Sequence, residues 1–278
     1  MGQTSKKLHR TLTKSAARLD LPTTETNPRP GTPSIEKFID EGLDPVHAVY
    51  VFLQHLTSNF SELVSQLREM KKFVKIVAKA EEEYMPSGPP MSPLTTSYFT
   101  CWAFYDLRFD GTDTLASCLI EANNVIWMNS HQLHALKLMT ASRMGIYEHV
   151  GVEGPHVMLR ELVTEAIFSC HVASGYLGRP GELWYVRLLP PLPDLVHYHV
   201  AFTTPYILTQ ASKQDWTQFL KRGVSQSGLG SDALHNFLKY GPGLNYWNEF
   251  VLKSYHHSQS DAIFLAGIPD LEKTLPHA

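Results

Sequence analysis

Cysteine is scarce in this chain, and the cysteines are not spaced as they are in disulfide frameworks or in paired metal-binding motifs. The three cysteines, Cys101, Cys118 and Cys170, lie far apart, are odd in number and form no CxxC pair. No disulfide framework is therefore expected, and this usage fits a reducing compartment. Because no secretory hydrophobic segment follows Met1 either, we predict a cytoplasmic protein.

Long apolar runs and a large net charge are missing as well. No run approaches the roughly 20 apolar residues that span a bilayer, so no transmembrane segment is expected. The formal net charge of −3 argues against a nucleic-acid binder that is basic over its whole surface, but it leaves room for a local basic patch. A hydrophobic content of 43% over 278 residues is ample for a folded core.

Short catalytic motifs are the third absence. The chain contains no G-x-S-x-G elbow, P-loop, Rossmann glycine pattern, H-E-x-x-H or kinase signature. This absence favours a non-enzymatic protein, although active sites that are recognised by geometry alone leave no such motif.

What the chain does contain is a sustained two-residue rhythm over residues 145–208. In the strand expected at 183–189, the rhythm places one apolar set on a single face: Trp184, Val186 and Leu188. Further candidate strands lie at 146–151, 156–163, 166–172 and 197–202. Five strands with short connections predict an α+β fold, in which an antiparallel β-meander or small barrel is flanked by helical N- and C-terminal layers.

Residues 145–192 combine these segments in a distinctive order. A strand and a turn lead into MLRELVTEAIFSCHV, a glycine-rich turn follows, and GELWYVRLLPPL completes the stretch. This order resembles the small β-meander domain that accompanies zinc-binding SEC-C motifs in some bacterial proteins. The resemblance implies a fold only, because the paired-cysteine zinc motif of those proteins is absent here.

Proline-rich stretches divide the rest of the chain. Residues 1–33 are expected to be a disordered basic tail, residues 34–92 a helical hairpin region, and residues 93–278 an α+β domain. The tail carries no acid over its first nineteen residues but several cations that are candidates for partner binding: Lys6, Lys7, Arg10, Lys14 and Arg18.

The same tail has an amphipathic pattern. Leu8, Leu12 and Leu19 fall on one helical face, so a basic helix could form on a partner. We expect that partner to be another protein, with nucleic acid or a membrane surface as alternatives. The composition is also typical of an organelle transit peptide.

Caps and periodicity predict the elements around the sheet. A helix capped by Asp44 is expected to end before a third helix that begins at Ser58 or Asn59. The aromatic stretch 95–109 alternates like a strand. Ser212 and Asp215 are spaced as a capping box. The remaining expected helices lie at 34–41, 112–123, 129–143, 233–240 and around 247–255, and a short strand is expected at 262–266.

His197 and His199 form the sharpest candidate site. If 197–202 is a strand, Tyr198, Val200 and Phe202 face the core and both histidines point the other way, where two imidazoles could bind one divalent transition metal. Further ligands would have to come from a scattered set: His171, Cys170, His256, His257 or Glu182. The alternative is two histidines on a solvent-facing strand.

A carboxylate site of the nuclease kind can also be drawn from Asp106, Glu161 and Glu182, although the usual E-x-K element is missing. The function predicted from the sequence is therefore a non-enzymatic interaction or adaptor protein within a larger intracellular assembly, with no cofactor. The alternative is a metal-dependent hydrolase or nuclease that uses the two histidines or these carboxylates.

Overall fold

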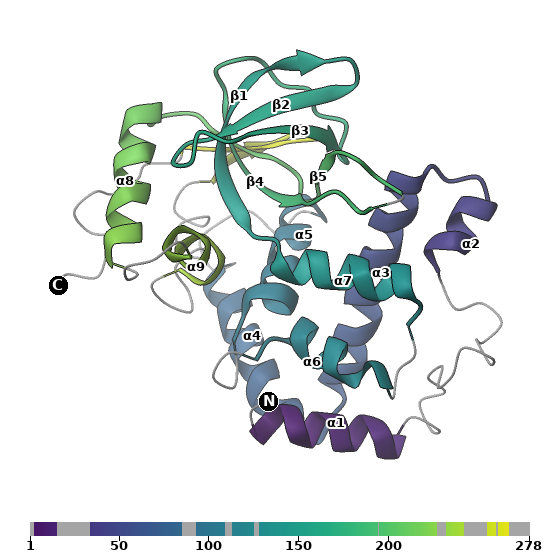
Figure 1. Ribbon diagram of the computed structural model, residues 1–278. Helices are drawn as coiled ribbons and strands as arrows, with labels where there is room; N and C mark the ends of the chain where they lie inside the picture. Colours follow the sequence, from purple (N-terminus) through teal and green to yellow (C-terminus); the bar gives the residue numbers. More distant parts are fainter. Residues whose placement is uncertain are drawn as a thin grey trace. The chain divides into compact units, whose positions relative to one another are not determined.

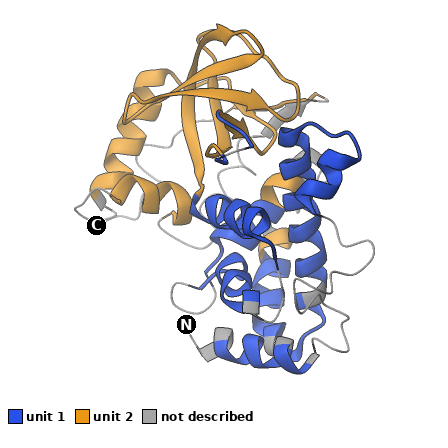
Figure 2. Ribbon diagram, turned by 45° about the vertical axis from the view of Figure 1, so that its right-hand side comes forward, with its two compact units in different colours: residues 1–79, 100–141, 192–197 blue, residues 80–99, 142–191, 198–278 orange. Residues whose placement is uncertain are grey.

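Helices occupy the first half of the chain, and the second half holds the sheet together with further helices (Figure 1). The structure, a computed structural model, describes residues 3–15, 34–84, 93–108, 113–124, 128–193, 195–226, 232–241, 255–259 and 261–266. Two compact units share the chain (Figure 2). Unit 1 comprises residues 1–79, 100–141 and 192–197, and unit 2 comprises residues 80–99, 142–191 and 198–278.

Unit 1 is helical. Its elements in chain order are α1 (Gln3–Ser15), α2 (Ile35–Asp40), α3 (Pro45–Ser65), the 3-10 turn η1 (Arg68–Met70), most of α4 (Lys71–Tyr84), the π-helical segment η2 (Trp102–Asp106), α6 (Leu115–Glu121), η3 (Ala122–Asn124) and α7 (Ser130–Ala141). The predicted Asp44 cap of α3 is confirmed, because its Oδ1 accepts from the backbone N–H groups of Val46 at 3.0 Å and His47 at 3.1 Å.

One predicted helix boundary was wrong. Helix α3 runs without interruption through Ser58 and Asn59, and the chain turns only after Ser65. Neither Ser58 nor Asn59 is a helix breaker of the strength of proline or glycine. The buried side chains of Phe60 and Val64 continue the apolar stripe across this point, so burial outweighs the local capping preference.

The aromatic stretch that alternates like a strand is also helical. Residues 93–106 form α5 (Pro93–Cys101) followed directly by η2. Tyr98, Trp102 and Tyr105 recur at intervals of four and three, which is the spacing of a helix face, and all three side chains are buried. The prediction of a strand failed because the aromatic pattern does not distinguish the two periods: Trp102 and Phe104 fit a strand, whereas Tyr98, Trp102 and Tyr105 fit a helix.

Unit 2 holds the sheet. Its strands are β1 (Met144–Glu153), β2 (His156–Glu161), β3 (Ile167–Val172), β4 (Leu183–Leu189), β5 (His199–Ala201), β6 (Tyr206–Leu208), β7 (Tyr255–Ser258) and β8 (Ile263–Leu265). Pairing runs β1-β2-β3-β5-β4 and returns from β4 to β1, which closes a small barrel (Figure 1). Strands β6, β8 and β7 extend the sheet beyond β4. The predicted α+β fold with a small barrel is confirmed.

The sheet is not purely antiparallel. Strands β3 and β5 pair in parallel, as do β6 and β8. Strand β1 pairs with both β2 and β4, and a register shift between His149 and Gly151 marks an irregularity in its ladder with β2. Such a bulge bends a strand, which lets one long strand serve both sides of the barrel.

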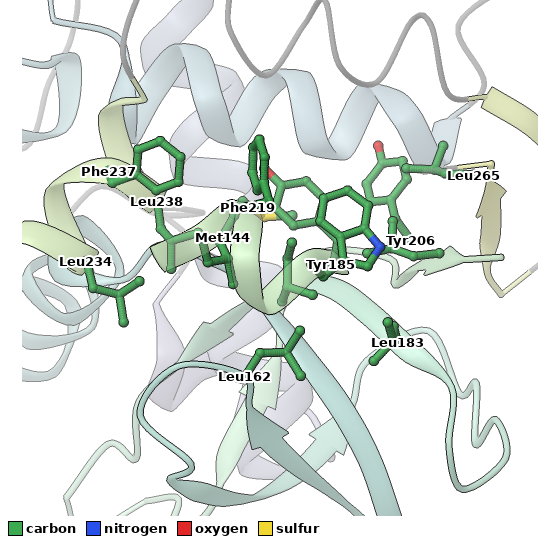
Figure 3. Close-up of a cluster of buried hydrophobic side chains, with 14 of the residues drawn as sticks. Met144, Leu162, Leu183, Tyr185, Tyr206, Phe219, Leu234, Phe237, Leu238 and Leu265 are labelled. Atoms are coloured by element: carbon green, nitrogen blue, oxygen red, sulfur yellow. The ribbon is translucent and has the colours of Figure 1, made fainter. Parts of the chain in front are cut away.

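Two apolar clusters stabilise unit 2. Trp184 and Val186 are fully buried in the barrel, as the alternation of β4 predicts, and Phe202 is buried as well. The second cluster packs the sheet against α8 (Lys213–Gln226), α9 (Ala233–Tyr240) and Tyr98 (Figure 3). The predicted capping box begins α8, where Asp215 N–H donates to Ser212 Oγ at 3.2 Å and Ser212 N–H to Asp215 Oδ2 at 3.0 Å.

Near the C-terminus, Tyr255 begins strand β7 and does not belong to a helix. The rest of the helix expected around 247–255 lies outside the described residues. His256 and His257 are therefore strand residues and not helix-end residues. The apolar segment expected at 262–266 is confirmed as β8.

Candidate functional site

The two histidines of the predicted metal site do not share a strand. His197 is exposed and lies in a bend, whereas His199 begins β5. Cys170 of β3 is the register partner of His199, and the His199 ring makes an edge contact with Phe168 at a centroid distance of 4.8 Å. Burial lowers the pKa of His199 below its usual value. A metal at these histidines stays a prediction.

The carboxylates drawn as a nuclease site have separate partners. Glu161 is buried and accepts from Arg143 Nη2 at 2.6 Å and from Thr164 Oγ1 at 2.6 Å. Glu182 accepts from Trp184 Nε1 at 3.0 Å and from the Tyr176 hydroxyl at 3.2 Å. Asp106 is buried at the end of η2. Within the described residues, no three His, Cys, Asp or Glu side chains gather so that they could hold a metal ion.

The described part of the basic N-terminal segment packs within unit 1. Residues 3–15 form helix α1, which contacts η1 and α6, and its Leu8 side chain is fully buried. The cations project on the other side of the helix, where four of them are exposed: Lys6, Lys7, Arg10 and Lys14. Arg18, the fifth predicted cation, lies outside the described residues.

A second row of cations begins on η1, which α1 contacts, and continues into α4. The turn η1 leads directly into α4, and four exposed cations stand on residues 68–75: Arg68, Lys71, Lys72 and Lys75. Glu69 is the only acidic residue between positions 68 and 79, and α1 has none. The basic surface is defined here as these eight residues: Lys6, Lys7, Arg10, Lys14, Arg68, Lys71, Lys72 and Lys75.

Reasoning from the sequence found the α1 half of the basic surface and missed the α4 half. The available signal was the recurrence of lysine every three or four residues beside the buried Phe73, which marks a cationic helix face. The contact between α1 and η1 brings the two halves of the basic surface together. No local sequence pattern predicts this contact.

Among the described residues, the charges of the basic surface have no carboxylate partner. In the part of the chain that the structure describes, none of the eight residues forms an ion pair. Several cations of unit 2 do have partners. Lys213 Nζ lies 2.7 Å from Glu148 Oε2, and Arg143 Nη2 lies 2.6 Å from Glu161 Oε1. Within the described residues, the basic surface therefore presents positive charge that no ion pair offsets.

No described helix combines the length and the apolar character needed to cross a membrane. No family model, curated protein or solved structure matches the chain, and the similarity of residues 145–192 to the β-meander that accompanies SEC-C motifs stays a prediction.

Proposed function

We propose that this chain is a non-enzymatic interaction protein that binds nucleic acid through its basic surface. The observation that supports this proposal is the group of eight exposed cations on α1, η1 and α4, for which the described residues supply no carboxylate partner. A polyanion that approaches them releases its condensed counterions, which supplies the main driving force of sequence-independent binding. The proposal keeps the cytoplasmic location and the adaptor role that the sequence predicts.

The spacing of the charges favours nucleic acid over a smaller anion. Lys6, Arg10 and Lys14 are four residues apart, so they recur at about 6 Å along the helix. Duplex DNA carries one charge per about 1.7 Å of its axis, which gives a row of cations continuous partners. Because the whole chain has a net charge of −3, we expect a polyanion to be attracted to this basic surface and not to the protein surface in general.

A bilayer is the less favoured partner because of how α1 is packed. A helix that lies in a membrane interface inserts its apolar face between the lipids. Leu8, on the apolar face of α1, is fully buried within the protein. The helix therefore offers a membrane its charges without that apolar anchor.

The test is a binding titration with labelled DNA at several salt concentrations. Replacing three cations of α1 (Lys6→Gln, Arg10→Gln, Lys14→Gln) should weaken binding to every DNA sequence alike. The slope of log K against log salt should become shallower by about one for each phosphate that is no longer neutralised. Lys71→Gln with Lys75→Gln should act in the same direction.

The matched control is Lys137→Gln with Lys221→Gln, which removes exposed cations of α7 and α8 that lie outside the basic surface. This control should leave both affinity and salt dependence unchanged. The proposal fails if the α1 triple variant keeps the wild-type salt slope. It also fails if the wild-type protein binds only phosphatidylserine vesicles and no DNA.

A further inference from the structure

The connectivity of the barrel singles out one of its faces. A closed order of β1-β2-β3-β5-β4, with β3 and β5 parallel and a long β1 shared by both sides, is the connectivity of the five-stranded Greek-key barrel called the OB-fold. Barrels of this type bind oligonucleotides or oligosaccharides over strands 2 and 3. Because a fold alone does not establish a function, the side chains on that face must carry the argument.

Strand register defines this face residue by residue. Met158 pairs with Ser169, and Arg160 pairs with Ile167, so these side chains project to one side of the β2–β3 ladder. The intervening residues Val157, Leu159 and Cys170 are fully buried on the barrel side. The outer side of β2 and β3 therefore consists of six residues: His156, Met158, Arg160, Ile167, Ser169 and His171.

Three rings gather on this outer side. The Tyr198 ring, which comes from the residue before β5, lies 4.2 Å from the His156 ring by centroid, with an interplanar angle of 42°. The His171 ring lies 6.1 Å from Tyr198. All three residues are half-buried, so part of each is accessible. Tyr198 thus reaches across β3 toward β2.

The placement of Tyr198 corrects the alternation expected for 197–202. His199 packs on Phe168 and Ala201 belongs to the barrel cluster, so these two residues of β5 face the barrel and Tyr198 lies on the outer side. The outer residues of β2 and β3 together with Tyr198 are called the ring face below.

Charge on the ring face is nearly balanced. Its one guanidinium, Arg160, has Glu148 at 3.6 Å and Glu165 at 3.9 Å. Ile167 is 54% exposed, which adds an apolar surface beside the rings. A face with rings and apolar area but little net charge suits the flat faces of bases better than it suits phosphates.

We infer that the ring face binds the unpaired bases of single-stranded nucleic acid by stacking. This inference rests on the proposed function, that the chain binds nucleic acid. Aromatic side chains on which bases stack are the recurring device of single-strand binding, and every base offers such a face. A duplex keeps its base faces stacked inside, so the ring face distinguishes single strands from duplexes.

The test uses two ligands: single-stranded oligothymidylate, and the duplex that it forms with oligoadenylate. Binding of each ligand to the full chain is measured by fluorescence anisotropy titration. Tyr198→Leu should weaken binding to the single strand about fivefold or more, the lower end of the loss expected for one stacking partner. Its affinity for the duplex should be unchanged. Tyr198→Phe keeps the ring and should bind as the wild type does. His156→Ala supplies the same comparison if Tyr198→Leu does not fold.

Leu177→Ala is the matched control, because Leu177 is 55% exposed in unit 2 but lies outside the ring face. It should leave binding to both ligands unchanged. The inference is overturned if Tyr198→Leu loses as much affinity for the duplex as for the single strand, or if it loses none. The proposed function still stands in that case, provided that the basic-surface variants make the dependence of log K on log salt shallower. A wild-type protein that binds neither ligand would overturn both.

Discussion

At the scale of single residues, Glu182 holds the loop between β3 and β4 in place. Its carboxylate accepts from Trp184 Nε1 and from the Tyr176 hydroxyl. Burial, followed by the charge of Glu182, raises the pKa of Tyr176 to about 12, so the hydroxyl keeps its proton and continues to donate. His149 Nε2 lies 2.9 Å from the Leu177 carbonyl oxygen, which fixes the middle of the loop.

Gly178 is the most confined residue of that loop. Its φ is +62°, and a Cβ built on it would lie 2.5 Å from Trp184 Cζ2 and 2.6 Å from Glu182 Oε2. Gly178→Ala should therefore lower the free energy of unfolding by more than the roughly 1–2 kcal/mol that left-handed backbone costs an ordinary residue. Chemical denaturation measures the loss.

Gly154→Ala isolates the steric part of this effect. Gly154 has a φ of +58°, but nothing lies within 4 Å of the position that a Cβ would occupy. Both substitutions incur the backbone cost, and only Gly178→Ala adds a clash with Trp184 and Glu182. Equal destabilisation by the two variants would show that the loop yields to the added methyl group.

At the scale of elements, α1 contributes both to the core of unit 1 and to the proposed binding of nucleic acid. Leu8 anchors the helix in unit 1, and the cations of α1 stand on the side away from it. A charged segment held in this way loses little conformational freedom when it binds a ligand, which favours affinity. The packing of α1 in unit 1 therefore predicts that removing the N-terminal segment destabilises the fold.

Leu8→Ala separates packing from charge. The substitution should destabilise the protein by about 2–5 kcal/mol, because it leaves a cavity at a fully buried position. It should also weaken DNA binding although every cation is retained, since α1 would no longer be held against η1. Thermal unfolding and the same DNA titrations check both effects.

Thr13→Ala is the control for this prediction, because Thr13 is an exposed residue of the same helix. It should change neither property appreciably. Unchanged stability in Leu8→Ala would show that α1 is not anchored by this side chain.

At the scale of the whole molecule, neither unit is a continuous segment. The chain passes between the units after residues 79, 99, 141, 191 and 197. Helix α5 contains one of these crossings, and its Tyr98 packs on the sheet of unit 2, 5.4 Å by ring centroid from Tyr206 and 6.1 Å from Tyr185. Unit 2 thus depends on a side chain that precedes its first strand by more than forty residues.

Tyr98→Ala tests this dependence. Removing a fully enclosed aromatic ring should cost roughly 3–5 kcal/mol of stability. The near-ultraviolet circular dichroism of the tyrosine and tryptophan cluster should change with it, because Tyr185 and Tyr206 lose a neighbour. Tyr98→Phe keeps the ring and should show a small loss. A wild-type unfolding midpoint in Tyr98→Ala would refute the packing role.

Local signals explain what was predictable from the sequence. The bounds of β4, the cap at Asp44 and the capping box at Ser212 follow from alternation and from hydrogen bonds between near neighbours. The parallel pairing of β3 with β5 and the position of Tyr198 depend on residues far apart in the chain. The α1 cations were found because they are close together in sequence, whereas their neighbours on α4 are brought near only by folding.

The interleaving of the units has a consequence for synthesis on the ribosome. Leu192 and Val196 are buried residues of unit 1, yet they are translated after β1 to β4 of unit 2 have been made. The N-terminal helices therefore leave the ribosome long before the last piece of their own unit exists. Chains usually fold domain by domain as they emerge. Here unit 1 can be completed only after β1 to β4 of unit 2 have been translated.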